Sequence, residues 1–176
     1  GVRVSLHPAG HILGSAQVRV EFRGEVWVVS GDYKRAHDPT CAPFDVQPCH
    51  AFVTEATFGL PVFRWDPSEG IAREICAWWD EMRIAGRPAV LFGYALGKSQ
   101  RLLAELARCT DRPVYVHGSL MPLIEIYRAA GVVMLPALRA TEGSRGRSFA
   151  GELIVAPLSA RGTLWMRRFN DHSAAC

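Results

Sequence analysis

The chain has 176 residues, of which 49% are apolar, and its formal net charge is +3. That length suits one ordinary domain or two small ones, and that apolar content argues against a disordered chain. No apolar run reaches the roughly 18 residues that span a bilayer, and the first ten residues lack the apolar centre of a signal peptide. We therefore expect a folded protein with no membrane partner.

The cysteines indicate a reducing compartment. There are five of them, and no two are spaced as Cys-x-x-Cys. An odd number argues against a disulfide framework, and the spacing excludes a zinc ribbon. We expect mostly buried, reduced thiols in a cytoplasmic protein.

Charge is distributed unevenly along the chain. Residues 1–56 carry five Lys and Arg against six Asp and Glu, a balance of −1, and residues 57–176 carry fifteen against eleven, a balance of +4. Seven Arg and only two Glu lie between Arg128 and Arg168. This pattern suits an anionic partner, but a solvated basic face would give the same count, so charge alone does not decide.

Short strands without a helix are expected over residues 1–56. Alternating or continuous apolar residues predict each strand, and Arg23-Gly24 predicts a tight hairpin turn between two of them. The predicted strands cover residues 2–6, 16–22, 25–30 and 50–56. We expect them to be antiparallel.

The pattern changes after Gly59, where helical and strand-like segments alternate. The predicted helices cover residues 67–86, 98–110 and 120–131, and the predicted strands cover residues 87–94, 113–118, 131–136 and 151–160. Such alternation predicts a mainly parallel sheet covered on both faces. The fold class expected for the whole chain is therefore α/β, with an α+β N-terminal part.

Three polar residues follow the ends of short strands. His11 lies in a turn between Gly10 and Ile12, Asp32 follows the strand over 25–30, and Glu55 closes the strand over 50–56. If these strands share a sheet, the three side chains meet at one edge, where a histidine and a carboxylate could bind metal. Two of these residues also have a plainer interpretation, since His11 could cap a strand and Asp32 could form an Asx-turn.

Four short sequence motifs follow one another along the chain and together are specific enough to indicate a protein family. They are "AGHILGSA" from Ala9, "SGD" from Ser30, "TEATFG" from Thr54 and "FGYALGKSQRLLAEL" from Phe92. The chain resembles the metallo-β-lactamase superfamily in its nucleic-acid-processing β-CASP branch. Its sequence is similar to those of bacterial DNA exonucleases that are encoded with an ATP-dependent DNA ligase. That group overlaps with mRNA 3′-end processing exonuclease-like proteins.

The resemblance implies a role for each motif residue. It assigns residues 1–58 to the C-terminal portion of the first metallo-β-lactamase half and 59–176 to the inserted β-CASP domain. It makes His11 a ligand of one metal ion, Asp32 a catalytic bridge between two, and Glu55 an acid that orients a histidine near the scissile phosphate. The implied cofactor is zinc, two ions per complete site, with manganese as the alternative.

The sequence also departs from the family pattern. His-x-His-x-Asp-His, which supplies most metal ligands, does not occur, and neither does the later Asp-His-Ala-Asp motif. We therefore expect a fragment truncated at both ends, catalytically incomplete by itself, with two ligands of a site that needs more.

For the complete enzyme, the resemblance implies a zinc-dependent nuclease that hydrolyses phosphodiesters with a hydroxide held by two metals. The expected partner is DNA, single-stranded or at an end, with a functional link to a DNA ligase in repair. Alternatives are an RNA 3′-end processing nuclease of the same branch, a hydrolase of small esters, or a non-catalytic β-CASP scaffold. The oligomeric state is left open.

Four basic residues of the inserted domain are candidate phosphate contacts: Lys98, Arg101, Arg145 and Arg147.

Overall fold

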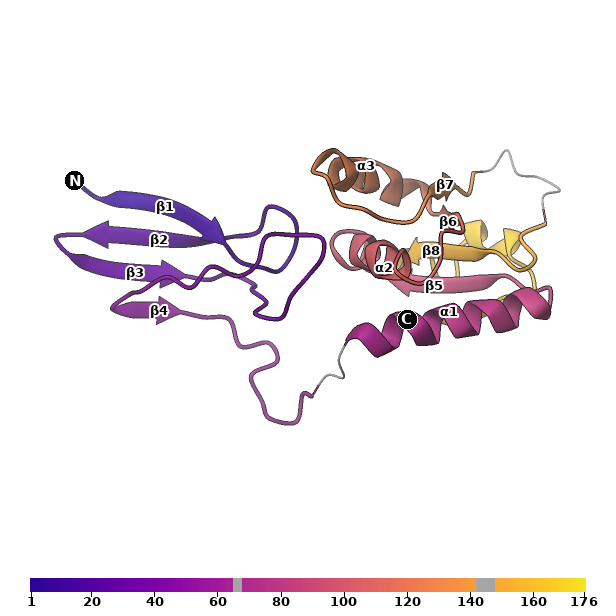
Figure 1. The fold of residues 1–176 in the computed structure, drawn as a ribbon, viewed down its shortest axis with the longest axis horizontal. Coiled ribbons are helices and arrows are strands. Elements are labelled where there is room, and N and C mark those ends of the chain that lie inside the picture. The colour runs from indigo at the N-terminus through magenta and orange to yellow at the C-terminus, as the bar shows by residue number, and fades with distance from the viewer. Residues whose placement is uncertain (65–67, 142–147) are drawn as a thin grey trace. The chain divides into compact units, whose positions relative to one another are not determined.

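The computed structural model describes residues 1–64, 68–141 and 148–176. The chain divides into two compact units, residues 1–66 and residues 67–176 (Figure 1). Within the described residues, no helix combines the length and the apolar character needed to cross a membrane.

The first unit is a four-stranded sheet. Its strands are β1 (Arg3–Pro8), β2 (Ala16–Phe22), β3 (Glu25–Val29) and β4 (Ala51–Val53), in the spatial order β1-β2-β3-β4. β2 pairs antiparallel with both β1 and β3, as predicted. The expectation of a wholly antiparallel arrangement is wrong for β4, which runs parallel to β3. The long segment between β3 and β4 carries the chain back across the sheet, and such a crossover permits parallel pairing.

The turn between β2 and β3 explains why these two strands pair so regularly. Arg23 and Gly24 both have positive φ, 50° and 85°, which matches a two-residue hairpin turn. This turn fixes the register in which Phe22 faces Glu25 and Val18 faces Val29.

One face of this sheet is covered by the segment that links β3 to β4. Val28 is fully buried there, and so is Gln17, whose amide donates to the Pro8 carbonyl at 3.0 Å and the Asp45 carbonyl at 2.6 Å. Apolar side chains of the opposite face, including Leu6 and Trp27, are exposed. The buried face anchors the linking segment, which carries Asp32 at its start.

The second unit has the expected parallel sheet with flanking helices (Figure 1). Its helices are α1 (Ser68–Ile84), α2 (Lys98–Leu106) and α3 (Met121–Ala129). Its strands are β5 (Ala89–Gly93), β6 (Val114–Val116), β7 (Ala137–Arg139), β8 (Leu153–Pro157) and β9 (Ser173–Ala175). The spatial order is β7-β6-β8-β5-β9, and every pair is parallel.

One predicted strand of the second unit is wrong, and one observed strand has no counterpart in the predictions. The strand predicted over residues 131–136 is wrong, because that segment is irregular and β7 begins only at Ala137. Its backbone is used elsewhere, since Leu135 N–H donates to the Leu103 carbonyl and Arg128 donates to the Leu135 carbonyl. The edge strand β9 was not predicted, because its sequence, Ser-Ala-Ala, has no β-branched or aromatic residue.

A chain of aromatic rings fills the core on one face of the parallel sheet. Phe149 packs edge-on against Tyr115 and Phe169, with ring centroids 5.1 Å and 5.0 Å apart. Val90, Phe92 and Ile154 belong to the same buried cluster. Alternate residues of these strands point to the opposite face, and on the helical side α1 contacts β5 and α2 contacts β8.

Candidate metal centre

The topology of the first unit explains why three distant sequence positions meet. β2 begins where β3 ends, because the two strands are antiparallel, and β4 ends beside β3, because these two are parallel. The turn between β1 and β2, the residues after β3 and the residues after β4 therefore lie at one end of the sheet. These three segments carry His11, Asp32 and Glu55 respectively.

His11 and Asp32 lie within reach of a common ligand. The His11 Nε2 atom is 3.9 Å from the Asp32 Oδ2 atom. Both side chains are open to solvent, with 43% of His11 and 73% of Asp32 exposed, so a small ion could approach the pair freely. The structure thus brings these two residues together, as their strand-end positions predicted.

Backbone geometry holds His11 in place. The Ser15 hydroxyl oxygen accepts hydrogen bonds from the amides of His11 and Ile12, both at 3.2 Å, which closes the turn. Gly10 has a φ of 70°, and a Cβ atom there would meet the Lys34 carbonyl and the Phe44 amide. Only glycine fits this close approach, so Gly10 lets the His11 turn pack against the segment that follows Asp32.

Glu55 is a carboxylate at the same end of the sheet. Its Oε2 atom accepts a hydrogen bond from the Thr57 amide at 2.7 Å. That bond lowers the pKa of Glu55, and the Thr57 hydroxyl and the nearby His11 lower it further, against a smaller opposing effect of burial. Glu55 is therefore ionised at neutral pH and adds negative charge beside His11.

Neighbouring residues that the sequence did not single out complete this end of the sheet. The Tyr33 ring lies 5.1 Å from Phe44 and 6.1 Å from Phe52, and the Thr54 hydroxyl donates to the Tyr33 hydroxyl at 3.4 Å. In the sequence, Tyr33 directly follows Asp32, and Thr54 directly precedes Glu55. This adjacency is the feature of the sequence that could have identified them as part of the site. Their contacts connect the residues after β3 with those after β4.

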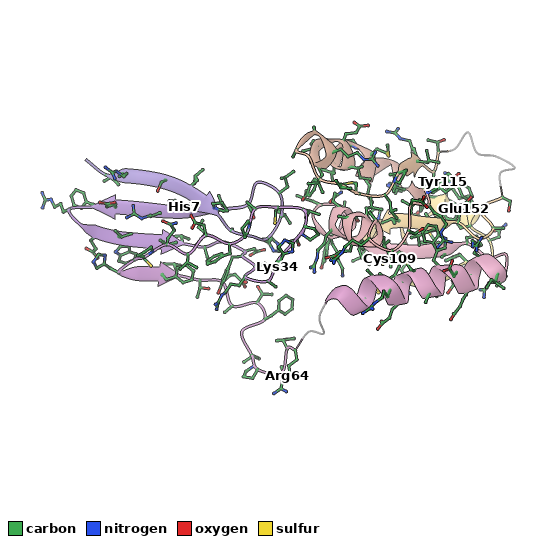
Figure 2. The ribbon with its side chains drawn as sticks, viewed as in Figure 1. His7, Lys34, Arg64, Cys109, Tyr115 and Glu152 are labelled. Atoms are coloured by element: carbon green, nitrogen blue, oxygen red, sulfur yellow. The ribbon has the colours of Figure 1, made fainter. Side chains whose placement is uncertain are left out.

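His7 has a structural environment. The His7 side chain is labelled in Figure 2. Its Nδ1 atom lies 3.1 Å from Asp45 Oδ2, and its Nε2 atom lies 2.9 Å from the Ser5 hydroxyl. Both ring nitrogens are thus engaged on the face of β1 that the linking segment covers.

Lys34, also labelled in Figure 2, donates to the buried Asp38 carboxylate at 2.9 Å.

The candidate phosphate contacts belong to the second unit. Lys98, the first residue of α2, is exposed. Arg101, one turn later, is half-buried, and its Nε atom lies 3.9 Å from Glu105. Arg145 and Arg147 lie outside the described residues.

His11 and Asp32 are the residues that could hold a metal at this end of the sheet. Imidazole nitrogen and carboxylate oxygen are both common donors to divalent metals. In the parts of the chain that the structure describes, no group of three or more His, Cys, Asp or Glu side chains is arranged as a metal site. Two donors and a neighbouring carboxylate are therefore what the described residues supply at this end of the sheet.

Comparison with known proteins gives several relatives, although no family model matches the chain. The chain is 32% identical over 174 residues to a probable DNA ligase of Opitutus terrae, which covers 98% of this chain and 16% of that protein. It is 25% identical over 134 residues to an RNase J-like protein of Methanocaldococcus jannaschii, covering 72% of this chain and 32% of that protein. It is 28% identical over 105 residues to cleavage and polyadenylation specificity factor 73 of Drosophila melanogaster, covering 58% and 15%.

The chain thus spans at most about a third of the length of these relatives. The mixed α/β fold, with its parallel sheet and flanking helices, agrees with the β-CASP architecture. Endoribonucleases YSH1 of several fungi are further relatives, each matching about a third to three fifths of this chain. The resemblance is confirmed: the chain is a relative of the β-CASP proteins of the metallo-β-lactamase superfamily.

Proposed function

We propose that this chain is part of a metal-dependent phosphodiesterase that acts on nucleic acid. The observation that carries the proposal is the 3.9 Å approach of His11 Nε2 to Asp32 Oδ2, beside the ionised Glu55. The names of the relatives, which include RNase J-like and endoribonuclease, support the choice of a phosphodiester substrate.

Zinc is the metal that we propose, with manganese as the alternative. Donor atoms on one tetrahedral zinc ion lie about 3.3 Å apart, given bonds of about 2.0–2.1 Å. The His11–Asp32 separation of 3.9 Å is slightly longer, so a small side-chain rotation would let both atoms bind one ion. The exposed Asp32 carboxylate has a second oxygen for a second ion, which suits the two-metal site that the resemblance implies.

Each residue then has a defined task. A bound metal pair supplies Lewis-acid stabilisation of the charge that develops on phosphate oxygens. His11 and Asp32 would hold that pair at the end of the sheet, and the turn closed by Ser15 would keep His11 aimed at it. Glu55, fixed by the Thr57 amide, would orient a neighbouring proton-bearing group. The presence of all three residues argues against a non-catalytic scaffold.

DNA is the substrate that we propose, cleaved by an exonuclease that works with an ATP-dependent DNA ligase in repair. The support is the match of 98% of this chain to a protein named probable DNA ligase. An RNA-processing nuclease is the second candidate, and the RNase J-like and YSH1 relatives support it as strongly.

Matched DNA and RNA oligonucleotides distinguish the two candidates. The protein that carries this chain is incubated with each strand, labelled at either end, in the presence of zinc, manganese or a chelator. We expect metal-dependent shortening of DNA from one end, faster than that of RNA. Faster cleavage of RNA would favour the second candidate, and no cleavage of either strand with any metal would refute the proposed function.

A further inference from the structure

Two cysteines from different elements of the second unit lie in contact. Cys76 belongs to α1, and Cys109 follows the end of α2, and these two helices pack against each other. The Cys76 and Cys109 thiols are hydrogen-bonded, and neither cysteine is in a disulfide. Their contact depends on the packing of α1 on α2, so the sequence spacing did not reveal it.

The residues around Cys109 favour binding of an anionic ligand. Cys109, which is labelled in Figure 2, is exposed. It lines an open pocket of about 230 Å³ together with Ala72, Arg73, Glu105 and Arg108. Glu105 is already neutralised, because Arg108 lies 3.4 Å and Arg101 lies 3.9 Å from its carboxylate oxygens. Two guanidinium groups, those of Arg73 and Arg108, and one carboxylate line this pocket, and Arg101 lies beside that carboxylate, so the pocket is positively charged.

We propose that Cys109 is a modification site for anionic low-molecular-weight disulfides, such as oxidised glutathione, and that Cys76 resolves the adduct into a Cys76–Cys109 disulfide. The pocket is smaller than the roughly 300–1,000 Å³ of sites for drug-sized ligands, so it would hold one arm of such a disulfide. The carboxylates of the bound disulfide would face Arg73 and Arg108. This inference concerns the second unit and is independent of the proposed nuclease activity.

The reaction is two successive thiol–disulfide exchanges. The Cys109 thiolate attacks one sulfur of the small disulfide, a protein–small-molecule disulfide forms, and the first thiolate leaves and takes up the proton that Cys109 lost. Cys76 then loses its proton and attacks the Cys109 sulfur, which releases the second small thiol. Two cysteines are oxidised by two electrons in total, and one small disulfide is reduced to two thiols.

The order of attack follows from the two environments. Burial raises the pKa of the Cys76 thiol to about 11, and the adjacent Cys109 and Asp80 raise it while Arg112 opposes them. Cys76 is therefore protonated near neutral pH, and the exposed Cys109 is the thiol that reacts first. The second step should accelerate as pH rises toward that value.

Intact-mass measurement and peptide mapping test the proposal on the whole 176-residue chain. The reduced chain is incubated with oxidised glutathione, and free thiols are then alkylated. We expect one linked pair of peptides containing Cys76 and Cys109, reversal by a reductant, and an upward shift of Tm by several degrees in the oxidised chain. Cys76→Ser, or Cys76→Ala if that variant unfolds, should stop at a mixed disulfide on Cys109.

Charge variants test the role of the pocket. Arg73→Gln combined with Arg108→Gln should slow the reaction with oxidised glutathione several-fold and leave the rate with neutral hydroxyethyl disulfide unchanged. Cys176→Ser, which removes an exposed thiol elsewhere, should alter neither rate. Adducts that form on Cys41, Cys49 or Cys176 in preference to Cys109, or a lasting mixed disulfide in the unaltered chain, would overturn the proposal.

Discussion

At the residue scale, Asp32 provides the sharpest test of the metal centre. Asp32→Asn keeps the shape of the side chain but removes the charge that offsets a cation, so hydrolysis by the protein that carries this chain should be lost. The loss should exceed the roughly 10–100-fold effect of substitutions around metal ligands, while nucleic-acid binding stays near normal. Labelled-strand cleavage and fluorescence anisotropy measure the two quantities.

The control is Asp111→Asn, which removes an exposed carboxylate from the second unit. It should leave cleavage unchanged. Near-normal turnover by Asp32→Asn would show that Asp32 does not bridge metals.

Gly10 should be intolerant of any side chain. Its φ of 70° strains an L-residue, and a Cβ atom would lie 2.8 Å from the Phe44 amide nitrogen and still closer to the Lys34 carbonyl. We expect Gly10→Ala to lower the free energy of unfolding by about 2–3 kcal/mol, measured by urea denaturation. Gly24→Ala has similar φ strain but no atom within 4 Å of the new Cβ, so it should cost only about 1 kcal/mol. Equal costs would mean that the close approach at Gly10 contributes nothing.

At the scale of elements, the segment that links β3 to β4 is held by a buried acid. Burial raises the pKa of Asp38, but hydrogen bonds from Thr40 and Lys34 outweigh it, so the pKa of Asp38 is lowered overall. Ionised Asp38 therefore stabilises the fold above its unfolded pKa of about 3.9, and this stabilisation disappears as pH falls through the lower folded value.

Asp38→Asn should therefore remove part of the acid sensitivity. At neutral pH it should reduce the free energy of unfolding by about 1.5–3 kcal/mol, and the difference from the unaltered chain should shrink below about pH 4. Urea denaturation across pH measures this, with the exposed Glu125→Gln as the control. A difference that stays constant down to the lowest pH would contradict the role of the ionised group.

Helix α1 is anchored by one of its two adjacent tryptophans. Trp79 is 1% exposed, donates to the Gly151 carbonyl at 3.0 Å and stacks under Arg112 at 4.1 Å. Trp79→Ala should cost about 3–5 kcal/mol in thermal or urea unfolding, and Trp79→Phe should cost less because it keeps most of the volume. On the same helix, Ile84 is 86% exposed, so Ile84→Ala should cost less than about 0.5 kcal/mol. Similar costs for both Ala variants would refute the anchoring role of Trp79.

The elements differ in how well their sequences predict them. The strand over residues 16–22 was predictable because alternation and the Arg23-Gly24 turn agree on one register. The apolar run over residues 131–136 wrongly predicts a strand, because Leu135 is buried by packing on α2 and not by strand pairing. The parallel placement of β4 depends on the path of a long irregular segment, which periodicity does not report.

At the scale of the whole molecule, the candidate site was predictable as a set of strand ends but not as a coordination geometry. The convergence of His11 and Asp32 follows from sheet topology, which the strand pattern suggested. The contact between Cys76 and Cys109 depends on how two helices pack, and nothing in their separation along the chain indicates it.

Residues 57–176, which carry the charge balance of +4, should bind single-stranded nucleic acid through phosphate charge. Arg128 and Arg168 donate to main-chain carbonyls, so they are poor candidates, whereas Lys98, Arg161 and Arg167 are exposed. Each neutralised phosphate contributes about −0.7 to the slope of log affinity against log salt, so three or four contacts predict a slope of about −2 to −3. Arg145→Ala combined with Arg147→Ala should make the slope shallower by about 1.4, because two contacts are lost.

Fluorescence anisotropy with a labelled oligonucleotide, repeated over a salt series, measures that slope for the whole chain. Arg3→Ala removes a positive charge at the start of β1, at the end of the sheet away from His11 and Asp32, and should leave the slope unchanged because Arg3 is not a candidate phosphate contact. The double variant should also weaken binding equally for strands of different sequence, because phosphates carry no base identity. An unchanged slope in the double variant would mean that Arg145 and Arg147 contact no phosphate, and salt-independent binding would contradict the electrostatic basis of the interaction altogether.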